Sequence, residues 1–202
     1  MKYAQEDAVE KATILFWKKG FQGSGMRDIQ QALDMRPGSI YARFQNKEGL
    51  FKLVVEQYVA HSKEKLQNVA DSDTPLLSLR DFFKTALINP DELRYMRQCL
   101  LVKSISELEL IGDVGKKAIL EGMVLLNKCF VNIIEKAVAS RELQDTTPVE
   151  FAADWLQNQF VGLRAFAILQ SDNKSIEKMI DKVLYDLTTQ WPAERILKKT
   201  PV

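Results

Sequence analysis

Cysteine and histidine are scarce in this chain of 202 residues. Two cysteines, Cys99 and Cys129, are too few for a disulfide scaffold, and with His61 as the single histidine they do not make a zinc site. A lone histidine also argues against Ser-His or Cys-His catalysis. The motifs HExxH, GxSxG, GxGxxG and GxxxxGK[ST] do not occur. We therefore expect no metal, no cofactor and no enzymatic activity, although the many carboxylates leave paired-acid hydrolysis open.

Long apolar runs and a strong net charge are absent as well. No run is long enough to span a bilayer, and the polar, acidic start MKYAQEDAVEKA does not resemble a secretory signal, so we expect a cytosolic protein without a membrane partner. The net charge is only +1, but residues 1–52 hold nine basic and six acidic side chains, which leaves +3 there and −2 on the remainder. This asymmetry has the right sign for phosphate contact near the N-terminal end.

Apolar residues recur at helical spacing along most of the chain, and no segment alternates as a strand would. We predict an all-α fold with about nine helices, three short ones followed by six longer ones. The predicted helices are one ending at Gly20, one over 26–33 with Ser24 as N-cap, Pro37 to Phe44, one beginning after the cap Asn46, 76–88, Glu92–Leu110, one ending near Ser140, 148–170 and 175–190.

The segment 24–51 is the most informative part of the sequence. It predicts two short helices joined by a tight turn and followed at once by a longer helix. The second short helix carries Ser39, Tyr41 and Arg43 beside the core-type residues Ile40 and Phe44. A short helix that its neighbours hold rigidly, with polar atoms facing outward, is the element that enters a DNA major groove. The pattern favours a DNA-binding protein over an enzyme.

The first 50 residues resemble the TetR-type one-component transcriptional repressors. The resemblance is carried by Leu15-Phe16, Gly20-Phe21, Ile29, Ala32, Gly38-Ser39-Ile40-Tyr41-Ala42-Arg43-Phe44 and Lys47-Glu48-Gly49-Leu50-Phe51. It implies a helix-turn-helix DNA-binding domain over residues 1–50 and a helical effector-binding and dimerisation domain over residues 51–202. It also implies a homodimer that binds a near-palindromic double-stranded DNA operator and represses transcription.

Family positions that contact DNA map onto specific residues of this chain. Phosphate contacts are implied for Ser24, Gly25, Arg27, Tyr41 and Lys47, and the recognition helix maps to Pro37, Gly38, Ser39, Ala42 and Arg43, with Arg36 just before it. The chain departs from the family pattern at four places: the family usually has Thr or Ser at Gly25, Gly at Asp34, Ser at Arg36, and His or Tyr at Ala42. Arg36 and Arg43 are candidates either for reading guanine or for holding phosphate.

The remainder of the chain suggests a dimer interface and an effector site. The helices expected over 148–170 and 175–190 are apolar over broad arcs, which favours a four-helix interface with a second copy. The alternative is that both helices complete the core.

The inducer is unknown, and one candidate is an electrophile or oxidant sensed by Cys99 near Arg97 and Lys103. The competing interpretation is that Cys99 packs as a small apolar residue. The other candidate is an apolar small molecule in a cavity lined by residues such as Phe82, Phe83, Tyr95, Met96, Met123, Phe130 and Trp155, each of which also suits ordinary core. The alternative function is a helical binding module whose DNA-binding head is degenerate.

Overall fold

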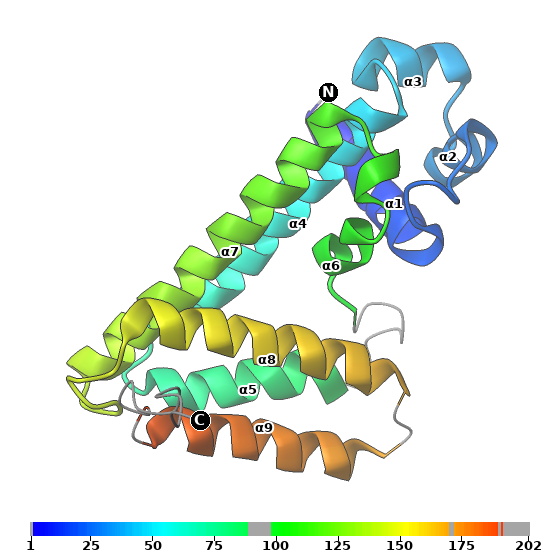
Figure 1. Cartoon of the computed structure of the whole chain (residues 1–202). Helices are drawn as coiled ribbons and strands as arrows, with labels where there is room; N and C mark the ends of the chain where they lie inside the picture. Colours follow the sequence, from blue (N-terminus) through cyan, green and yellow to red (C-terminus); the bar gives the residue numbers. More distant parts are fainter. Residues whose placement is uncertain (1, 89–97, 170–171, 190, 192–202) are drawn as a thin grey trace, which may run out of the picture.

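The computed structural model describes residues 2–88, 98–169, 172–189 and 191, and over these ranges the chain is helical without any strand. Three helices form a head at one end of the molecule (Figure 1): α1 (Lys2–Lys19), α2 (Met26–Leu33) and α3 (Pro37–Phe44). Gly20 ends α1 because it takes the left-handed conformation with φ +77°, which is accessible to glycine without steric cost. The predicted end of the first helix is confirmed.

Two long helices connect the head to the body. They are α4 (Lys47–Ala70) and α7 (Asp113–Ala139), which lie side by side along their length (Figure 1). Close packing depends on Gly122, since a Cβ atom there would lie 2.7 Å from a methyl carbon of Val59. The apolar face of α4 is buried, with Leu50, Phe51 and Val54 fully enclosed.

The body is a stack of α5 (Pro75–Ile88), α8 (Val149–Leu169) and α9 (Asn173–Thr188), at the end of α4 and α7 away from the head (Figure 1). Its core is aromatic: the rings of Phe83 and Phe160 stack with centroids 4.5 Å apart, and Phe82 lies 5.3 Å from Phe160. The apolar stripe of α9, which includes Ile176 and Ile180, is buried inside the chain's own fold. This stripe therefore completes the core, as the alternative interpretation held.

The nine α-helices of the described residues confirm the predicted fold class, but two local predictions are wrong. In place of a helix over Glu92–Leu110, the described residues hold α6 (Leu100–Ile105) and a 3-10 turn, η2 (Leu108–Leu110), while Glu92–Arg97 lie outside the described residues. Cys99 has an extended backbone with ψ 128° and so begins the helix as its N-cap. The N-cap of α2 is Gly25 and not Ser24.

Tyr95 and Met96, two of the residues predicted to line an effector cavity, lie outside the described residues. Within the described helices, none is long and apolar enough to cross a membrane.

Candidate nucleic-acid interface

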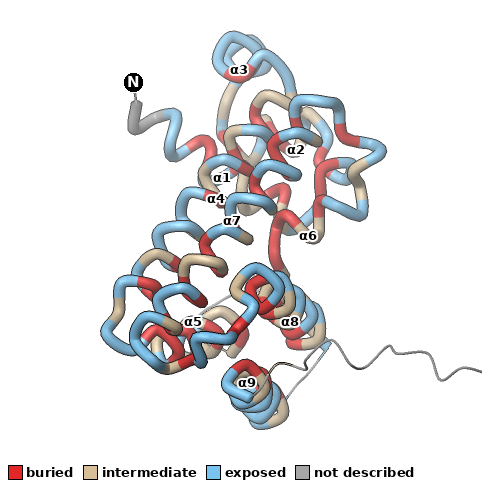
Figure 2. The backbone as a smooth tube through the Cα atoms, turned by 60° about the vertical axis from the view of Figure 1, so that its left-hand side comes forward, coloured by how far each residue is buried: buried red, intermediate tan, exposed pale blue. Residues whose placement is uncertain are grey.

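The most exposed element of the head is α3. Figure 2 shows it with pale blue on most positions, and only Ile40 and Phe44 are buried, at 0% and 3% exposure. These two side chains anchor the helix to the head core, while its other residues face outward. The exposed positions are Arg36, Pro37, Gly38, Ser39, Tyr41, Ala42 and Arg43, which are all the recognition-helix residues predicted from the sequence.

Local sequence explains why α3 begins where it does. Pro37 occupies the first helical position, where its missing N–H leaves no hydrogen bond unmade, and Arg36 is the extended N-cap residue. The turn before it depends on Asp34, which adopts the left-handed conformation with φ 52° and ψ 45°. Aspartate tolerates this region better than most residues, so the family's usual glycine is not required to form the turn.

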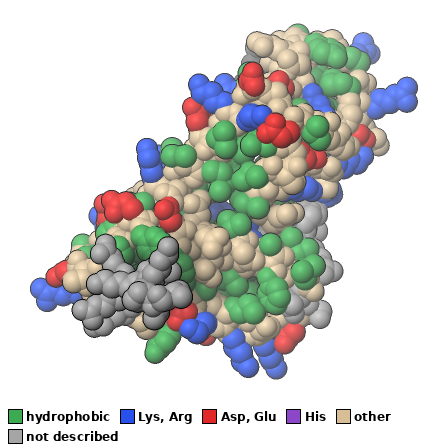
Figure 3. Space-filling view, in the orientation of Figure 1, with side chains coloured by type: hydrophobic (Ala, Val, Ile, Leu, Met, Phe, Trp, Pro, Cys, Tyr) green, Lys and Arg blue, Asp and Glu red, His purple; other side chains and the backbone are tan. Residues whose placement is uncertain are grey.

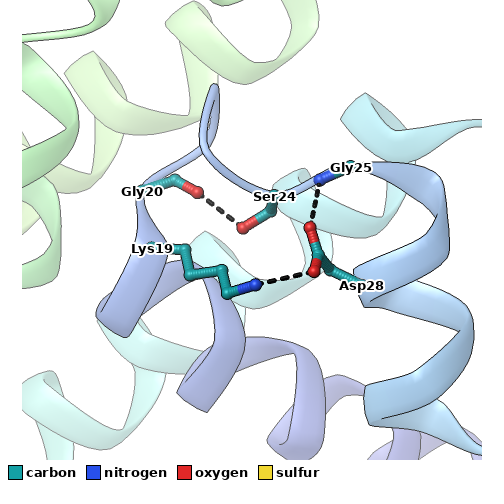
Figure 4. A network of polar contacts seen from close by, with 5 residues as sticks. All are labelled: Lys19, Gly20, Ser24, Gly25 and Asp28. Carbon is teal, nitrogen blue, oxygen red and sulfur yellow. Dashed lines mark hydrogen bonds and ion pairs between the residues drawn. The ribbon is translucent and has the colours of Figure 1, made fainter.

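The start of α2 is held by a polar network (Figure 4). The Asp28 carboxylate accepts a hydrogen bond from the Gly25 N–H at 2.9 Å and pairs with the Lys19 ammonium at 2.6 Å. The hydrogen bond from Lys19, followed by that from Gly25, holds the pKa of the Asp28 carboxyl below its ordinary value. Gly25 and Arg27 remain exposed beside this network.

Ser24 differs from the expectation that its hydroxyl meets a phosphate. The residue is fully buried, and its hydroxyl donates to the Gly20 carbonyl oxygen at 2.7 Å (Figure 4). Its hydroxyl hydrogen therefore closes the turn after α1 and does not point to solvent.

At the start of α4 the predicted cap is confirmed, because the Asn46 side chain accepts from the Gly49 N–H at 2.8 Å. Lys47 follows at the first helical position, half-buried, with its ammonium 4.2 Å from the centroid of the Phe21 ring. Burial lowers the pKa of the Lys47 ammonium, and the charge of Glu107 opposes this effect. The Phe21 ring holds the Lys47 ammonium in place beside the N-terminus of α4. Both the ammonium and the helix N-terminus attract anions, so this position is suited to binding a phosphate.

The head is tied to α6 by hydrogen bonds that the sequence analysis missed. The Lys103 ammonium donates to the carbonyl oxygens of Trp17 and Lys18, at 2.5 and 3.1 Å, at the end of α1. The Glu107 carboxylate accepts from the Phe21 N–H at 2.7 Å. The last carbonyl oxygens of a helix and the first N–H group after it have no partner within the helix. Lys103 and Glu107 supply hydrogen-bond partners for these groups at the end of α1. These partners lie 85 or more residues apart, so no local pattern announces them.

These contacts also change the expectation for Cys99. Of the two predicted activators, Lys103 is engaged with α1, and Arg97 lies outside the described residues. Cys99 is 8% exposed and accepts a hydrogen bond from the Tyr58 hydroxyl, with oxygen and sulfur 3.4 Å apart. Cys129 is likewise buried, and burial raises the pKa of its thiol. Both cysteines have the environment of packed residues.

Among the residues predicted to line an effector cavity, Phe82, Met123 and Phe130 line a small pocket of about 40 Å³. Phe83 is fully buried core, and Trp155 instead packs against Trp191 with ring centroids 5.5 Å apart. Arg164, the only charged residue among the buried residues of the described chain, is not among the predicted site residues. A signal was available, since Arg164 is the sole charge between residues 155 and 169 and lies four positions after the buried Phe160.

Comparison with known proteins agrees with this geometry. The family described as bacterial regulatory proteins, tetR family, matches residues 8–54. The HTH-type transcriptional repressor ComR of Escherichia coli is 30% identical over 83 residues, which are 40% of this chain and 40% of ComR. The chain thus spans about two fifths of the length of the curated relatives that it matches first.

Solved structures match over nearly the whole chain. A TetR-family transcriptional regulator from Agrobacterium tumefaciens superposes with a TM-score of 0.80 at 18% identity, covering 93% of this chain and 99% of that one. The reduced form of NemR from E. coli superposes with a TM-score of 0.78 at 17% identity, covering 89% and 95%. At this level of identity the likeness is one of fold.

Proposed function

Because the chain belongs to the tetR family of bacterial regulatory proteins, we propose that it is a homodimeric transcriptional repressor that a small molecule releases from its operator. The operator is a near-palindromic double-stranded DNA site. The domain division goes with this proposal: residues 1–50 bind DNA, and residues 51–202 bind the effector and the second copy. We place the protein in the cytoplasm and assign it no enzymatic activity.

The observation that carries the proposal is the exposure of α3. Two buried anchors fix the helix, and every other position from Arg36 to Arg43 is open to a groove. We assign base contacts to Arg36, Ser39, Ala42 and Arg43, since arginine pairs with guanine edges and small side chains meet thymine methyl groups. Phosphate contacts go to Arg27 on α2, Tyr41 on α3 and Lys47 at the start of α4, whereas the predicted Gly25 contact has no free N–H, because that group donates to Asp28.

A second copy has a surface to occupy on α8. Along one side of this helix Asn158, Gly162, Ala165 and Leu169 are exposed at spacings of three and four, with Leu169 exposed by 76%. Figure 3 shows hydrophobic side chains gathered over this part of the body. Exposed apolar residues on a helix are typical of a symmetric interface, and small residues let two helices approach closely. We propose that α8 and α9 of two copies pair there.

The buried state of Cys99 favours a bound small molecule over a reactive inducer. An electrophile must reach the thiol, and only 8% of the residue is exposed. The alternative function, a binding module with a degenerate head, rests on the departures at Gly25, Asp34 and Arg36. The Asp34 turn forms without the family's glycine, which weakens that alternative.

The test is a selection of binding sites from random duplex DNA with the full-length protein, followed by fluorescence anisotropy at low and moderate salt with unrelated DNA as competitor. We expect one enriched near-palindrome whose binding survives the competitor, with half-sites about 34–36 Å or somewhat more apart. The same titration of Arg43→Ala should show relaxed preference at one base position of each half-site. Failure to enrich any sequence, with only salt-sensitive binding that the competitor removes, would contradict the proposal and support the degenerate head.

A further inference from the structure

The Lys47 ammonium takes its position from the turn that follows α1. It lies 4.2 Å from the centroid of the Phe21 ring, which is 8% exposed and packs against the Phe51 ring at 4.9 Å. The face of an aromatic ring attracts a cation, so a ring that is itself fixed also fixes the ammonium over it. The place of Phe21 therefore determines where Lys47 offers its charge to a phosphate.

Glu107 holds the backbone of Phe21. Its carboxylate, between α6 and η2, accepts a hydrogen bond from the Phe21 N–H at 2.7 Å. A hydrogen bond to an ionised acceptor is stronger than one between neutral groups. The carboxylate also lies against Gly20, where a Cβ atom would be 2.7 Å from one of its oxygens. A residue outside the DNA-binding head thus packs closely on the turn that carries the Phe21 ring.

The first turn of α4 is fixed from outside the head as well. Glu48, the neighbour of Lys47, accepts a hydrogen bond from the Gly115 N–H at 2.9 Å, in the first turn of α7. A carboxylate at a helix N-terminus is favourable because free N–H groups and the helix dipole both attract it. The backbone of Lys47 is therefore tied to α7, while its side chain takes its position from Phe21.

The charge of Glu107 also acts on Lys47 directly. It raises the pKa of the Lys47 ammonium, against the larger lowering by burial, so the two groups are electrostatic neighbours. A carboxylate beside the ammonium repels an incoming phosphate. The two properties of Glu107 therefore have opposite effects on DNA binding, because its oxygen fixes the turn under Lys47 while its charge competes with the phosphate.

We propose that Glu107 is a positioning residue for the phosphate contact of Lys47, acting through the Phe21 N–H and the Phe21 ring. The inference rests on the proposed DNA-binding function and assigns to the DNA contact a residue that lies in the effector domain. Because Glu107 stands between α6 and α7, a shift of this segment moves the acceptor of the Phe21 N–H and, with it, the Lys47 ammonium.

The test compares Glu107→Gln with Glu107→Ala by fluorescence anisotropy on the selected operator and on unrelated duplex DNA. Both variants lack the charge, but the glutamine amide oxygen still accepts from the Phe21 N–H, whereas alanine has no acceptor. We expect Glu107→Gln to bind both duplexes at least as tightly as the parent, and Glu107→Ala to bind them about threefold or more weakly than Glu107→Gln. Glu109 is the matched control, since it is exposed and pairs with Lys116, so Gln and Ala there should bind equally.

The same pair of Glu107 variants in a Lys47→Ala background tests whether Glu107 acts through Lys47. We expect the difference between Gln and Ala to disappear there, because the Phe21 ring no longer holds a cation. A purely structural role of Glu107 would leave the difference in place, since it would affect the head as a whole. Circular dichroism and thermal unfolding report whether each variant is folded.

A measurement without DNA separates this inference from the proposed function. The titration of the Lys47 ammonium is followed by NMR, with its signal assigned by its loss in Lys47→Ala. We expect the pKa of Lys47 to fall in Glu107→Gln, because a neighbouring negative charge is removed, and to stay unchanged in Glu109→Gln.

An unchanged Lys47 titration in Glu107→Gln, equal DNA binding by the Gln and Ala variants, or a difference that survives in the Lys47→Ala background would each overturn the inference. If no operator is selected but unrelated duplex shows the difference between Gln and Ala, the role of Glu107 stands and the repressor is refuted. Specific operator binding without that difference does the reverse, and failure to bind any duplex overturns both.

Discussion

A methyl group added at Gly38 separates the stability of the head from its affinity for DNA. A Cβ atom built on Gly38 meets no atom within 4 Å, so the protein itself has room for alanine there. Gly38 is the second residue of α3, and alanine loses less backbone entropy than glycine in a helix. We expect Gly38→Ala to raise the free energy of unfolding by about 0.5 kcal/mol, or Tm by ~1–2 °C for a chain of this size.

The same methyl group should weaken binding to the operator. It points into the open space that a phosphate backbone fills when the start of α3 approaches the groove, and it pushes away the groups that make contact there. Losing one good contact costs about 1–3 kcal/mol, so we expect affinity to fall by about tenfold or more. Denaturant unfolding and fluorescence anisotropy on the selected operator measure the two effects separately.

Gly25→Ala is the matched control. Gly25 is exposed in the same head, with φ −77°, and a Cβ atom there lies 3.5 Å from the Asp28 carboxylate, an ordinary contact. We expect its operator affinity to stay within about threefold of the unaltered protein, because the family accommodates Thr or Ser at this position. The reasoning fails if Gly38→Ala is less stable than the parent, if it binds DNA as well as the parent, or if Gly25→Ala loses as much affinity.

Three further predictions address the rest of the molecule. Tyr41→Phe and Lys47→Ala should each weaken binding to all DNA sequences alike, and Lys47→Ala should reduce the slope of log affinity against log salt by about 0.9; an unchanged slope would remove Lys47 from the contact set. Gly20→Ala should cost more than about 1 kcal/mol, because φ +77° is strained for alanine and its Cβ would lie 2.7 Å from a carboxylate oxygen, and thermal unfolding that matches the parent would contradict this. Ala165→Glu should convert the proposed dimer to a monomer in analytical ultracentrifugation, whereas Ala60→Glu on an exposed face of α4 should not. A dimer in both variants would show that the interface does not include α8.

The sequence predicted best where structure follows from local chemistry. The caps at Gly20 and Asn46, the proline start of α3 and its two buried anchors all depend on residues within one or two turns of each other, so their spacing alone indicates them. These starts, ends and anchors of the head helices are therefore predictable from residue spacing, whereas the role of Ser24 is not. The predicted DNA and effector contacts remain predictions, as does the domain boundary after residue 50.

The misses have two origins, a competing local hydrogen-bond acceptor and contacts between distant parts of the chain. Ser24 has the chemistry of an N-cap, but burial under the turn after α1 gives its hydroxyl a nearer acceptor. The apolar pattern around Leu100 suits a long helix, yet the described helix is six residues long. The partners of Lys103 and Glu107 are set by how α6 packs on the head, which no short window of sequence contains.

The aromatic cluster in the head limits which segments of this protein can be exchanged with those of its relatives. Phe16 and Phe21 both pack against Phe51, with ring centroids 5.2 and 4.9 Å away, although Phe51 belongs to α4. A chimera that joins residues 1–50 of this chain to the body of a relative would therefore build one hydrophobic core from two different sequences. It would also remove Lys103 and Glu107, which bind the end of α1 and the Phe21 N–H. DNA specificity should accordingly be exchangeable among such proteins by replacing exposed residues of α3. A whole head should be transferable only together with Phe51, Lys103 and Glu107.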